Sequence, residues 1–355
     1  MSSPAPVPRR FSTIGEVIDA ARDRLEPDVW DYCAGGAGTE ATLRRNRAAL
    51  DALLLQPRVL RDVSACRTQT SFAGIPLALP MMLAPVGTIS LFDAGGAATC
   101  ARAAARAGTA AFVGLLSVPA LEDVAAAANA PLIFQLYVRG DRGWTLDLAL
   151  RAEAAGCRAL CITVDSPVDG RRERDLRNRF DRRSRQERPN LGAAYARRDL
   201  QATLTWDDVE WLAARTALPL VLKGITSPAD ARAAADAGAA AIVVSNHGGR
   251  QLDHQLSSIE ALGPVLEAAG DRLEVAVDSG FERGTDVVKA LALGARAVLI
   301  GKLQCYALAA GGEDALVETL ELVAEETRTT LALLGACGPD ELDAGHVRPS
   351  PAPWT

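Results

Sequence analysis

Eight short apolar runs, separated by alanine-rich segments of helical period, limit the folds open to this chain more than any other feature. None of the runs shows the polar alternation of a half-buried strand. The runs are Met81–Ala84, Ala110–Leu115, Leu132–Tyr137, Ala159–Val164, Leu218–Lys223, Ala240–Ser245, Glu274–Asp278 and Ala297–Gly301. The helical segments are Gly95–Ala107, Leu121–Asn129, Leu146–Ala155, Trp206–Ala214, Pro228–Ala237, Ile259–Ala268 and Gly284–Ala292.

Continuous apolar strands that alternate with helices are typical of a parallel sheet covered by those helices. Eight such units predict an α/β fold, a closed (β/α)8 TIM barrel. An open doubly wound sheet is the alternative, but no glycine-rich dinucleotide fingerprint follows the first run. We predict one barrel domain over residues 11–345, with a disordered tail at 1–10 and a C-terminal tail at 346–355. Residues 11–79 are expected to form an N-terminal helical extension, with helices over Thr13–Leu25 and, broken at Gly35, over Asp28–Leu54.

Charge, hydropathy and cysteine content exclude several classes of protein. Lysine and arginine total 38 against 44 aspartates and glutamates, a formal net charge of -6 that gives little support to nucleic-acid binding. The longest apolar candidate for a membrane span, Pro76–Val86, is short and interrupted by prolines. The start of the chain lacks the apolar core of a signal peptide, so we expect a cytoplasmic protein. Seven scattered cysteines signal neither a disulfide framework nor a zinc site.

Rare residue types gather where the predicted strands end. In a (β/α)8 barrel the chemistry takes place at the C-terminal ends of the strands. Two of the three lysines and one of the three histidines lie there, although some polar residues at strand ends are simply loop residues. The residues that close the runs include Pro85, Gly87, Gln135, Tyr137, Thr163, Asp165, Lys223, Ser245, His247, Asp278, Gly280, Gly301 and Lys302.

The densest local motif is the string from Ser245 to Asp253, which reads SNHGGRQLD. Its histidine, His247, directly follows a buried strand, and the glycines allow the loop to approach a ligand closely. Arg250 offers a two-pronged donor for a carboxylate. Taken alone, a loop histidine more often has a structural role than a role as general base.

Together with other motifs, this string resembles the FMN-dependent α-hydroxy acid oxidase and dehydrogenase family, which includes glycolate oxidase, lactate oxidase and mandelate dehydrogenase. The matching motifs are Thr163-Val164-Asp165, Gly170-Arg171-Arg172, Leu222-Lys223-Gly224 and the stretch Gly284–Ala295, and the resemblance runs from about Phe11 to about Gly335. It implies FMN as cofactor, oxidation of a 2-hydroxy acid to the 2-oxo acid, and an electron acceptor that is oxygen, a quinone or a redox protein. It also implies a homo-oligomer, commonly a tetramer.

The resemblance assigns catalytic roles to six residues. His247 is expected to remove a proton from the substrate, while Asp165 orients its ring and stabilises the imidazolium. Arg250 and Arg172, assisted by Tyr32, are expected to bind the substrate carboxylate. Tyr137 is expected to contact the substrate oxygen.

The resemblance also assigns a cofactor site. It implies that Lys223 lies near N1 and O2 of the flavin, where its charge stabilises the reduced form. The other expected cofactor-binding residues are Ala84, Pro85, Val86, Gly87, Gly114, Gln135, Thr163, Ser245, Asp278, Ser279, Gly280, Glu282, Arg283, Gly301 and Lys302. No metal ion is expected.

The sequence departs from the family at the expected phosphate end. The family usually has Asp-Gly-Gly-x-Arg and a later Gly-Arg, whereas this chain reads Asp278-Ser279-Gly280-Phe281-Glu282 and Gly301-Lys302. A carboxylate beside a phosphate costs on the order of a few kcal/mol unless it turns away to a partner such as Arg283. Gly114 also stands where many members offer a hydroxyl. We therefore expect FMN binding that is weaker than usual.

Residues 171–200 are expected to form a polar lid over the barrel mouth. The segment Arg171–Arg198 contains eleven arginines and four acidic residues, but without interleaved aromatics a nucleic-acid-binding arm is the less favoured interpretation. Membrane-bound relatives have an apolar insert in this region. Here the segment is short and polar, so we expect no membrane attachment.

The residues expected to shape the substrate pocket are small. Gly87 lacks a methyl group often present in the family, and Leu116 stands where glycolate-specific relatives carry an indole. We therefore expect a bulky or aryl 2-hydroxy acid, unless Phe180 or Tyr195 of the lid folds inward. Two alternatives remain open: a flavin-poor homologue that acts as a binding protein, and a barrel enzyme that acts on a phosphorylated metabolite.

Overall fold

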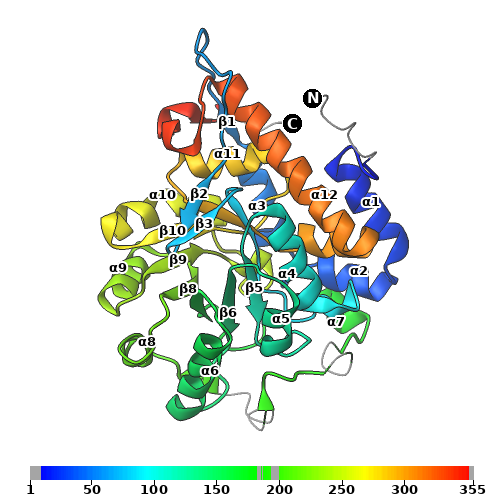
Figure 1. Cartoon of the computed structure of the whole chain (residues 1–355), viewed down its shortest axis with the longest axis vertical. Coiled ribbons are helices and arrows are strands. Elements are labelled where there is room, and N and C mark those ends of the chain that lie inside the picture. The colour runs from blue at the N-terminus through cyan, green and yellow to red at the C-terminus, as the bar shows by residue number, and fades with distance from the viewer. Residues whose placement is uncertain (1–8, 182–184, 186, 193–199, 352–355) are drawn as a thin grey trace.

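The computed structural model describes residues 9–351 except 182–184, 186 and 193–199. Eight parallel strands close into a barrel in the order β4-β5-β6-β7-β8-β9-β10-β11, and helices surround it (Figure 1). The strands are β4 (Met81–Leu83), β5 (Ala111–Gly114), β6 (Leu132–Leu136), β7 (Ala159–Thr163), β8 (Leu220–Ile225), β9 (Ala241–Val244), β10 (Glu274–Val277) and β11 (Ala297–Ile300). The predicted (β/α)8 TIM barrel is confirmed: seven of the eight apolar runs contain one barrel strand each, and β8 starts within its run and extends to Ile225.

The helices between the strands also follow the predicted pattern. They are α4 (Gly96–Ala107), α5 (Leu121–Ala127), α6 (Arg142–Ala154), α8 (Trp206–Ala213), α9 (Pro228–Asp236), α10 (Ser258–Ala269) and α11 (Gly284–Ala292). A short helix, α7 (Glu173–Arg177), lies within the segment predicted to be a lid. The long helix α12 (Lys302–Leu334) was not predicted; Gly311 and Gly312 interrupt its helical backbone.

The N-terminal extension forms three helices, α1 (Ile14–Arg24), α2 (Pro27–Ala34) and α3 (Ala41–Asp51). Thr13 caps α1 by accepting a hydrogen bond from the Glu16 backbone N–H. Helix α1 packs along α12, whereas α3 contacts the loop that follows β9. The extension therefore reaches the C-terminal end of the barrel, where the chemistry of this fold takes place.

The opposite end of the barrel is closed. A hairpin of β2 (Thr70–Phe72) and β3 (Ile75–Leu77) contacts β10 and β11. Its side chains Phe72, Ile75 and Leu77 are buried in one apolar cluster with barrel-interior residues such as Met82 and Ile133. Since the hairpin covers this end, we expect ligands to enter from the C-terminal ends of the strands, as is usual in this fold.

The first and last of the described residues are not part of the barrel sheet. The part of the expected N-terminal tail that covers residues 1–8 lies outside the described residues. The expected C-terminal tail begins with a strand: β12 (Val347–Pro349) pairs antiparallel with β1 (Leu53–Leu55). No helix in the described part of the chain has the length and apolar character to cross a membrane.

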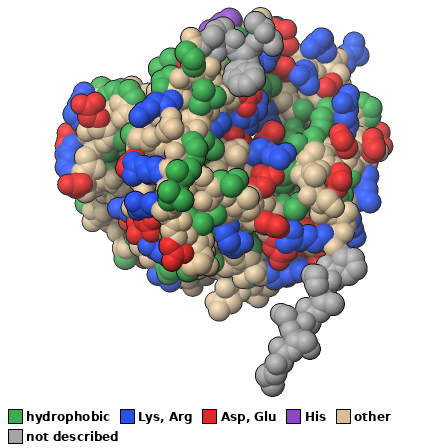
Figure 2. All heavy atoms as spheres, turned by 90° about the horizontal axis from the view of Figure 1, so that it is seen from above, with side chains coloured by type: hydrophobic (Ala, Val, Ile, Leu, Met, Phe, Trp, Pro, Cys, Tyr) green, Lys and Arg blue, Asp and Glu red, His purple; other side chains and the backbone are tan. Residues whose placement is uncertain are grey.

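Charged side chains of both signs are mixed over the face shown in Figure 2. Many charged side chains of the described residues form ion pairs, such as Arg45 with Glu260 at 2.7 Å and Arg151 with Glu122 at 2.9 Å. Such exposed pairs each contribute little to stability.

Candidate active site

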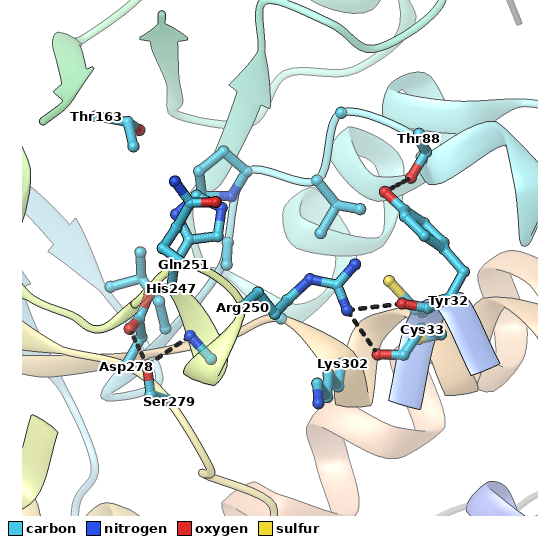
Figure 3. Close-up of a pocket in the computed structure, with 18 of the residues that line it drawn as sticks. Tyr32, Cys33, Thr88, Thr163, His247, Arg250, Gln251, Asp278, Ser279 and Lys302 are labelled. Atoms are coloured by element: carbon cyan, nitrogen blue, oxygen red, sulfur yellow. Dashed lines mark hydrogen bonds between the residues drawn. The ribbon is translucent and has the colours of Figure 1, made fainter. Parts of the chain in front are cut away.

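A cavity of about 480 Å³ opens at the C-terminal ends of the strands, a size typical of small-molecule and cofactor sites. Most of the site residues predicted from the sequence line it, and Figure 3 labels several of them. These are Tyr32, Ala84, Pro85, Val86, Gly87, Tyr137, Thr163, Arg172, Lys223, His247, Arg250, Asp278, Ser279, Gly280, Glu282, Gly301 and Lys302.

His247 and Asp165 face each other across the barrel mouth. His247 Nδ1 lies 3.0 Å from Asp165 Oδ1, and its Nε2 lies 3.5 Å from the Tyr137 hydroxyl. Burial opposes ionisation of Asp165, but its attraction to His247 and Lys223 outweighs burial, so the pKa of Asp165 is below its usual value. An ionised Asp165 accepts a hydrogen bond from the Nδ1–H group of His247. This leaves Nε2 as the nitrogen that can take up a proton.

The loop that carries His247 has a strained backbone. His247, Gly248 and Gly249 all have positive φ angles, 60°, 66° and 71°. Gly249 also packs so closely on α3 that a Cβ there would lie 2.7 Å from the backbone nitrogen of Leu43. Tight contact with the N-terminal extension thus fixes this conformation.

Arg250, Tyr32 and Arg172 lie together. Arg250 Nη1 donates to the Tyr32 carbonyl at 2.6 Å, and its guanidinium carbon lies 4.9 Å from the centre of the Tyr32 ring. Arg172 lies 6.0 Å from the same ring centre and donates from Nε to the Arg250 carbonyl. The Tyr32 hydroxyl accepts a hydrogen bond from Thr88, so its own proton is available to a ligand. Two guanidinium groups and a phenol are a suitable set for a carboxylate.

A lysine lies on the floor of the cavity. Lys223 Nζ forms an ion pair with Asp278 Oδ2 at 2.7 Å and donates to Ser245 Oγ at 2.7 Å. Burial favours the neutral amine, but Asp278 and Asp165 outweigh it and raise the pKa of Lys223. Lys223 is therefore a permanent positive charge at the base of the site.

The neighbouring strands contribute small and polar groups. Gln135 donates to the Thr163 hydroxyl at 2.9 Å, behind the cavity wall. A Cβ at Gly114 would lie 3.4 Å from the Gln135 side-chain oxygen. Gln135, Gly114, Asp165 and Ser245 support the lining residues and do not themselves line the cavity.

At the far end of the cavity lie Lys302 and Glu282. Lys302 Nζ donates to the carbonyls of Ala34 and Gly35, and burial, with Arg250 as the next cause, lowers its pKa to about 7. Burial raises the pKa of Glu282, whereas Arg47 and Lys302 act in the opposite direction. The expected Glu282–Arg283 pair is not formed: Arg283 pairs with Glu326 at 2.9 Å and does not line this cavity.

Several lining residues were not predicted from the sequence, and they come mainly from α3 and the loops. Arg44 and Arg47 of α3 line the cavity, and Arg47 forks onto Asp286 at 2.7 Å. Their spacing of three residues, which places both on one helix face, was the available signal. The other unpredicted lining residues include Thr88, Arg139, Asp169, Arg188 and Gln251.

Phe180 of the predicted lid stacks on Tyr32, with ring centres 4.8 Å apart. Tyr195, the other lid residue considered, lies outside the described residues.

The donor set fits a flavin phosphate. Lys302 is a partly buried ammonium group whose hydrogen bonds, within the described residues, go only to carbonyls, so an anion can still neutralise it. Gly280, which also lines the cavity, has φ +93°, and a Cβ there would lie 3.2 Å from Asn46, so both its conformation and its packing on α3 favour glycine. Among the described residues, no group of histidine, cysteine and acidic side chains is arranged to hold a metal ion.

Comparison with known proteins agrees with this geometry. Residues 21–349 match the family model of the FMN-dependent dehydrogenases. The chain is 43% identical to an L-lactate oxidase from Nostoc sp., over 94% of this chain and 96% of the relative. It is 45% identical to a 4-hydroxymandelate oxidase from Amycolatopsis orientalis, over 92% and 95%. The crystal structure of mandelate oxidase with (S)-2-phenylpropionate superimposes with a TM-score of 0.89 at 43% identity, covering 95% of this chain and 98% of that one.

The chain therefore belongs to the FMN-dependent dehydrogenase family. It is an oxidoreductase that uses FMN to oxidise the CH–OH group of 2-hydroxy acids.

Proposed function

We propose that this protein oxidises a bulky or aryl 2-hydroxy acid, of the mandelate type, to the corresponding 2-oxo acid. The observation that carries this proposal is the juxtaposition of a carboxylate-binding set, Arg250, Arg172 and Tyr32, with the His247–Asp165 pair at one cavity. When bound, FMN supplies the two-electron acceptor.

In this proposal, Arg250 and Arg172 bind the substrate carboxylate and Tyr32 donates its hydroxyl proton to it. Nε2 of His247 accepts a proton from the 2-hydroxyl group in a hydride route, or from the 2-carbon in a carbanion route. Asp165 keeps the opposite nitrogen protonated and stabilises the imidazolium that results. Tyr137, whose hydroxyl lies 3.5 Å from Nε2, contacts the substrate oxygen in either route.

Lys223 holds a positive charge beneath the site, and Lys302 with the backbone around Gly280 binds the phosphate of the cofactor. Ala84 to Gly87, Thr163 and Ser279 border the flavin, and Gln135, Ser245 and Gly114 support them. Arg283, which pairs with Glu326 outside the cavity, has no part in this proposal.

Two observations support a large substituent on the substrate. Gly87 has no side chain on the cavity wall, and Leu116 opposite it is a branched aliphatic residue rather than a ring. A relative that is 45% identical is a 4-hydroxymandelate oxidase, whereas another of similar identity is an L-lactate oxidase. The two relatives are thus named for a small and a large substrate, and the small residues of the pocket lining support a large substrate for this protein.

We further propose a cytoplasmic homotetramer that passes its electrons to oxygen, a quinone or a redox protein. Light scattering of the purified protein measures the assembly. The protein is first reduced anaerobically and then mixed, in separate experiments, with oxygen, with a soluble quinone or with cytochrome c. The acceptor that reoxidises it identifies the class of acceptor.

The test of the proposed function is anaerobic bleaching of the bound flavin by (S)-mandelate, followed between 350 and 500 nm. We expect the wild-type protein to bleach and His247→Gln to retain flavin without bleaching, because the substrate proton then has no acceptor. A purified wild-type protein without flavin absorbance favours the binding-protein alternative. Normal bleaching in His247→Gln contradicts the role of the histidine.

A further inference from the structure

Ser279 has a backbone conformation that favours glycine. Its φ angle is +81°, and the residue is only 8% exposed. An L-residue with a side chain is disfavoured in this region. The serine side chain must therefore make contacts that offset the strain.

The Ser279 hydroxyl makes two hydrogen bonds, one in each direction. It donates to Asp278 Oδ1 at 2.7 Å and accepts from the backbone N–H of Gly248 at 2.9 Å. The first is a bond to an ionised carboxylate, which is stronger than a neutral one. Figure 3 shows Ser279 directly beside Asp278, on the side of the cavity where His247 lies.

These bonds close a ring of contacts around the base of the site. The other carboxylate oxygen of Asp278 pairs with Lys223, and Lys223 Nζ donates to Ser245 Oγ at 2.7 Å. Ser245 Oγ in turn accepts from the backbone N–H of His247 at 3.1 Å. Two consecutive backbone amides, those of His247 and Gly248, are therefore held by two hydroxyls that the Lys223–Asp278 ion pair connects.

The loop needs such support because His247, which has a side chain, has a positive φ angle of 60°, whereas the positive φ angles of Gly248 and Gly249 cost little. Without the Ser279 hydroxyl, the Gly248 N–H loses its hydrogen-bond partner at the point where the strained backbone turns toward the cavity. The ring also fixes the loop relative to Lys223, whose charge lies below it.

We propose that Ser279 is a positioning residue. It fixes the position of the His247 loop relative to the Lys223–Asp278 pair, so that the imidazole is correctly placed for proton transfer. This inference rests on the proposed function, because it takes His247 as the base. Ser279 acts through the hydroxyl and not through its backbone alone.

Two substitutions separate the hydroxyl from the backbone strain. Ser279→Gly removes the hydroxyl and relieves the strain, whereas Ser279→Ala removes the hydroxyl and keeps a Cβ at φ +81°. We expect Ser279→Gly to unfold at a higher denaturant concentration than Ser279→Ala. We expect both variants to lower the rate constant of anaerobic flavin reduction by about 10-fold or more, because small misplacements of a reacting group are costly.

The substrate concentration for half-maximal reduction should change by less than about twofold, because Arg250, Arg172 and Tyr32 do not belong to the ring. Flavin retained on dialysis should equal that of the wild type. Ser117→Ala is the matched control: it removes an equally buried hydroxyl, which donates to the Gly114 carbonyl, and should leave the reduction rate unchanged.

Reduction of Ser279→Gly at the wild-type rate overturns the inference while the proposed function stands. A loss of flavin that accounts for the whole loss of rate also overturns it, since Ser279 would then act on cofactor binding alone. If the flavin-loaded wild type is not reduced by any of mandelate, lactate and glycolate, the proposed function fails, and the inference fails with it.

Discussion

Lys302 and Arg250 donate hydrogen bonds to the same oxygen atom, the carbonyl of Gly35, at 3.2 and 3.1 Å. Gly35 caps the C-terminal end of α2, where helix carbonyls carry partial negative charge. Two cations from different parts of the barrel thus converge on one helix end. Burial of the Lys302 ammonium group, with the positive charge of Arg250 as the next cause, lowers the pKa of Lys302 to about 7.

The lowered pKa of Lys302 makes the stability of the flavin-free protein depend on pH. The unfolded chain holds this proton up to its ordinary pKa of 10.5, whereas the folded protein releases it near pH 7. Since the unfolded state then binds more protons, the contribution of Lys302 to stability rises from pH 7 towards pH 10, by at most about 1.4 kcal/mol per pH unit. The free energy of unfolding, measured with denaturant between pH 7 and 9, should rise less steeply with pH in Lys302→Met than in the wild type, both free of flavin. Saturating FMN should also make the wild-type free energy rise less steeply with pH. Equal pH dependence of the flavin-free wild type and Lys302→Met contradicts this account.

Arg250→Lys should weaken substrate binding more than it slows the chemical step. A lysine can still reach the carbonyls that hold Arg250 Nη1, but it lacks the planar fork for a carboxylate. Loss of one charge-assisted hydrogen bond, about 1.5–3 kcal/mol, predicts an increase in KM of about 10- to 100-fold. Steady-state kinetics measure both constants. Arg45→Lys, at a bidentate arginine outside the cavity, is the control, and an unchanged KM in Arg250→Lys excludes the carboxylate role.

Glu282→Arg should increase FMN affinity. The carboxylate lines the cavity, and Arg283 is engaged with Glu326 and does not neutralise it. An arginine replaces a repulsive charge with a fork for the phosphate, whereas Glu282→Gln removes only the repulsion. Fluorescence titration of flavin-free protein should therefore give dissociation constants that decrease from wild type to Gln to Arg, by about 10-fold or more overall. Equal affinity of all three proteins means that the phosphate binds elsewhere.

Sequence patterns predicted the barrel because each strand is a continuous apolar run between helices. They missed α12, since Gly311 and Gly312 interrupt its helical pattern, and β12, which forms only through pairing with β1, about 290 residues earlier. Such long-range pairing has no local signal.

The same limit applies to the site. Strand ends located His247 and Lys223, because the fold itself brings strand ends together. The buried Asn46–Asn246 pair, in which each amide donates to the other at 2.9 and 2.7 Å, joins α3 to the His247 loop. Asn246 lies in the SNHGGRQLD string, but nothing in the sequence marks Asn46 as its partner; the packing of α3 on the barrel mouth brings the two together. The resemblance implied Arg283 at the cofactor, but in the structure Arg283 pairs with Glu326 and does not line the cavity.

The final prediction concerns the size of the substrate. A Cβ added to Gly87 would lie 2.8 Å from the Cβ of Leu116, closer than side-chain carbons approach in proteins. Gly87→Ala therefore forces Leu116 to move, and the space over the flavin face narrows from both sides. A ring or methylene group that no longer fits costs about 1–3 kcal/mol of catalytic discrimination.

We expect the wild type to prefer mandelate and 2-hydroxyoctanoate to lactate and glycolate. We expect Gly87→Ala to lose efficiency with the first two acids by about 10-fold, while its efficiency with lactate changes little. Leu116→Gly, which removes the Cβ that clashes, should restore mandelate oxidation when it is combined with Gly87→Ala. A wild-type preference for glycolate, measured as kcat/KM over the four acids, shows that the pocket is closed to large substituents.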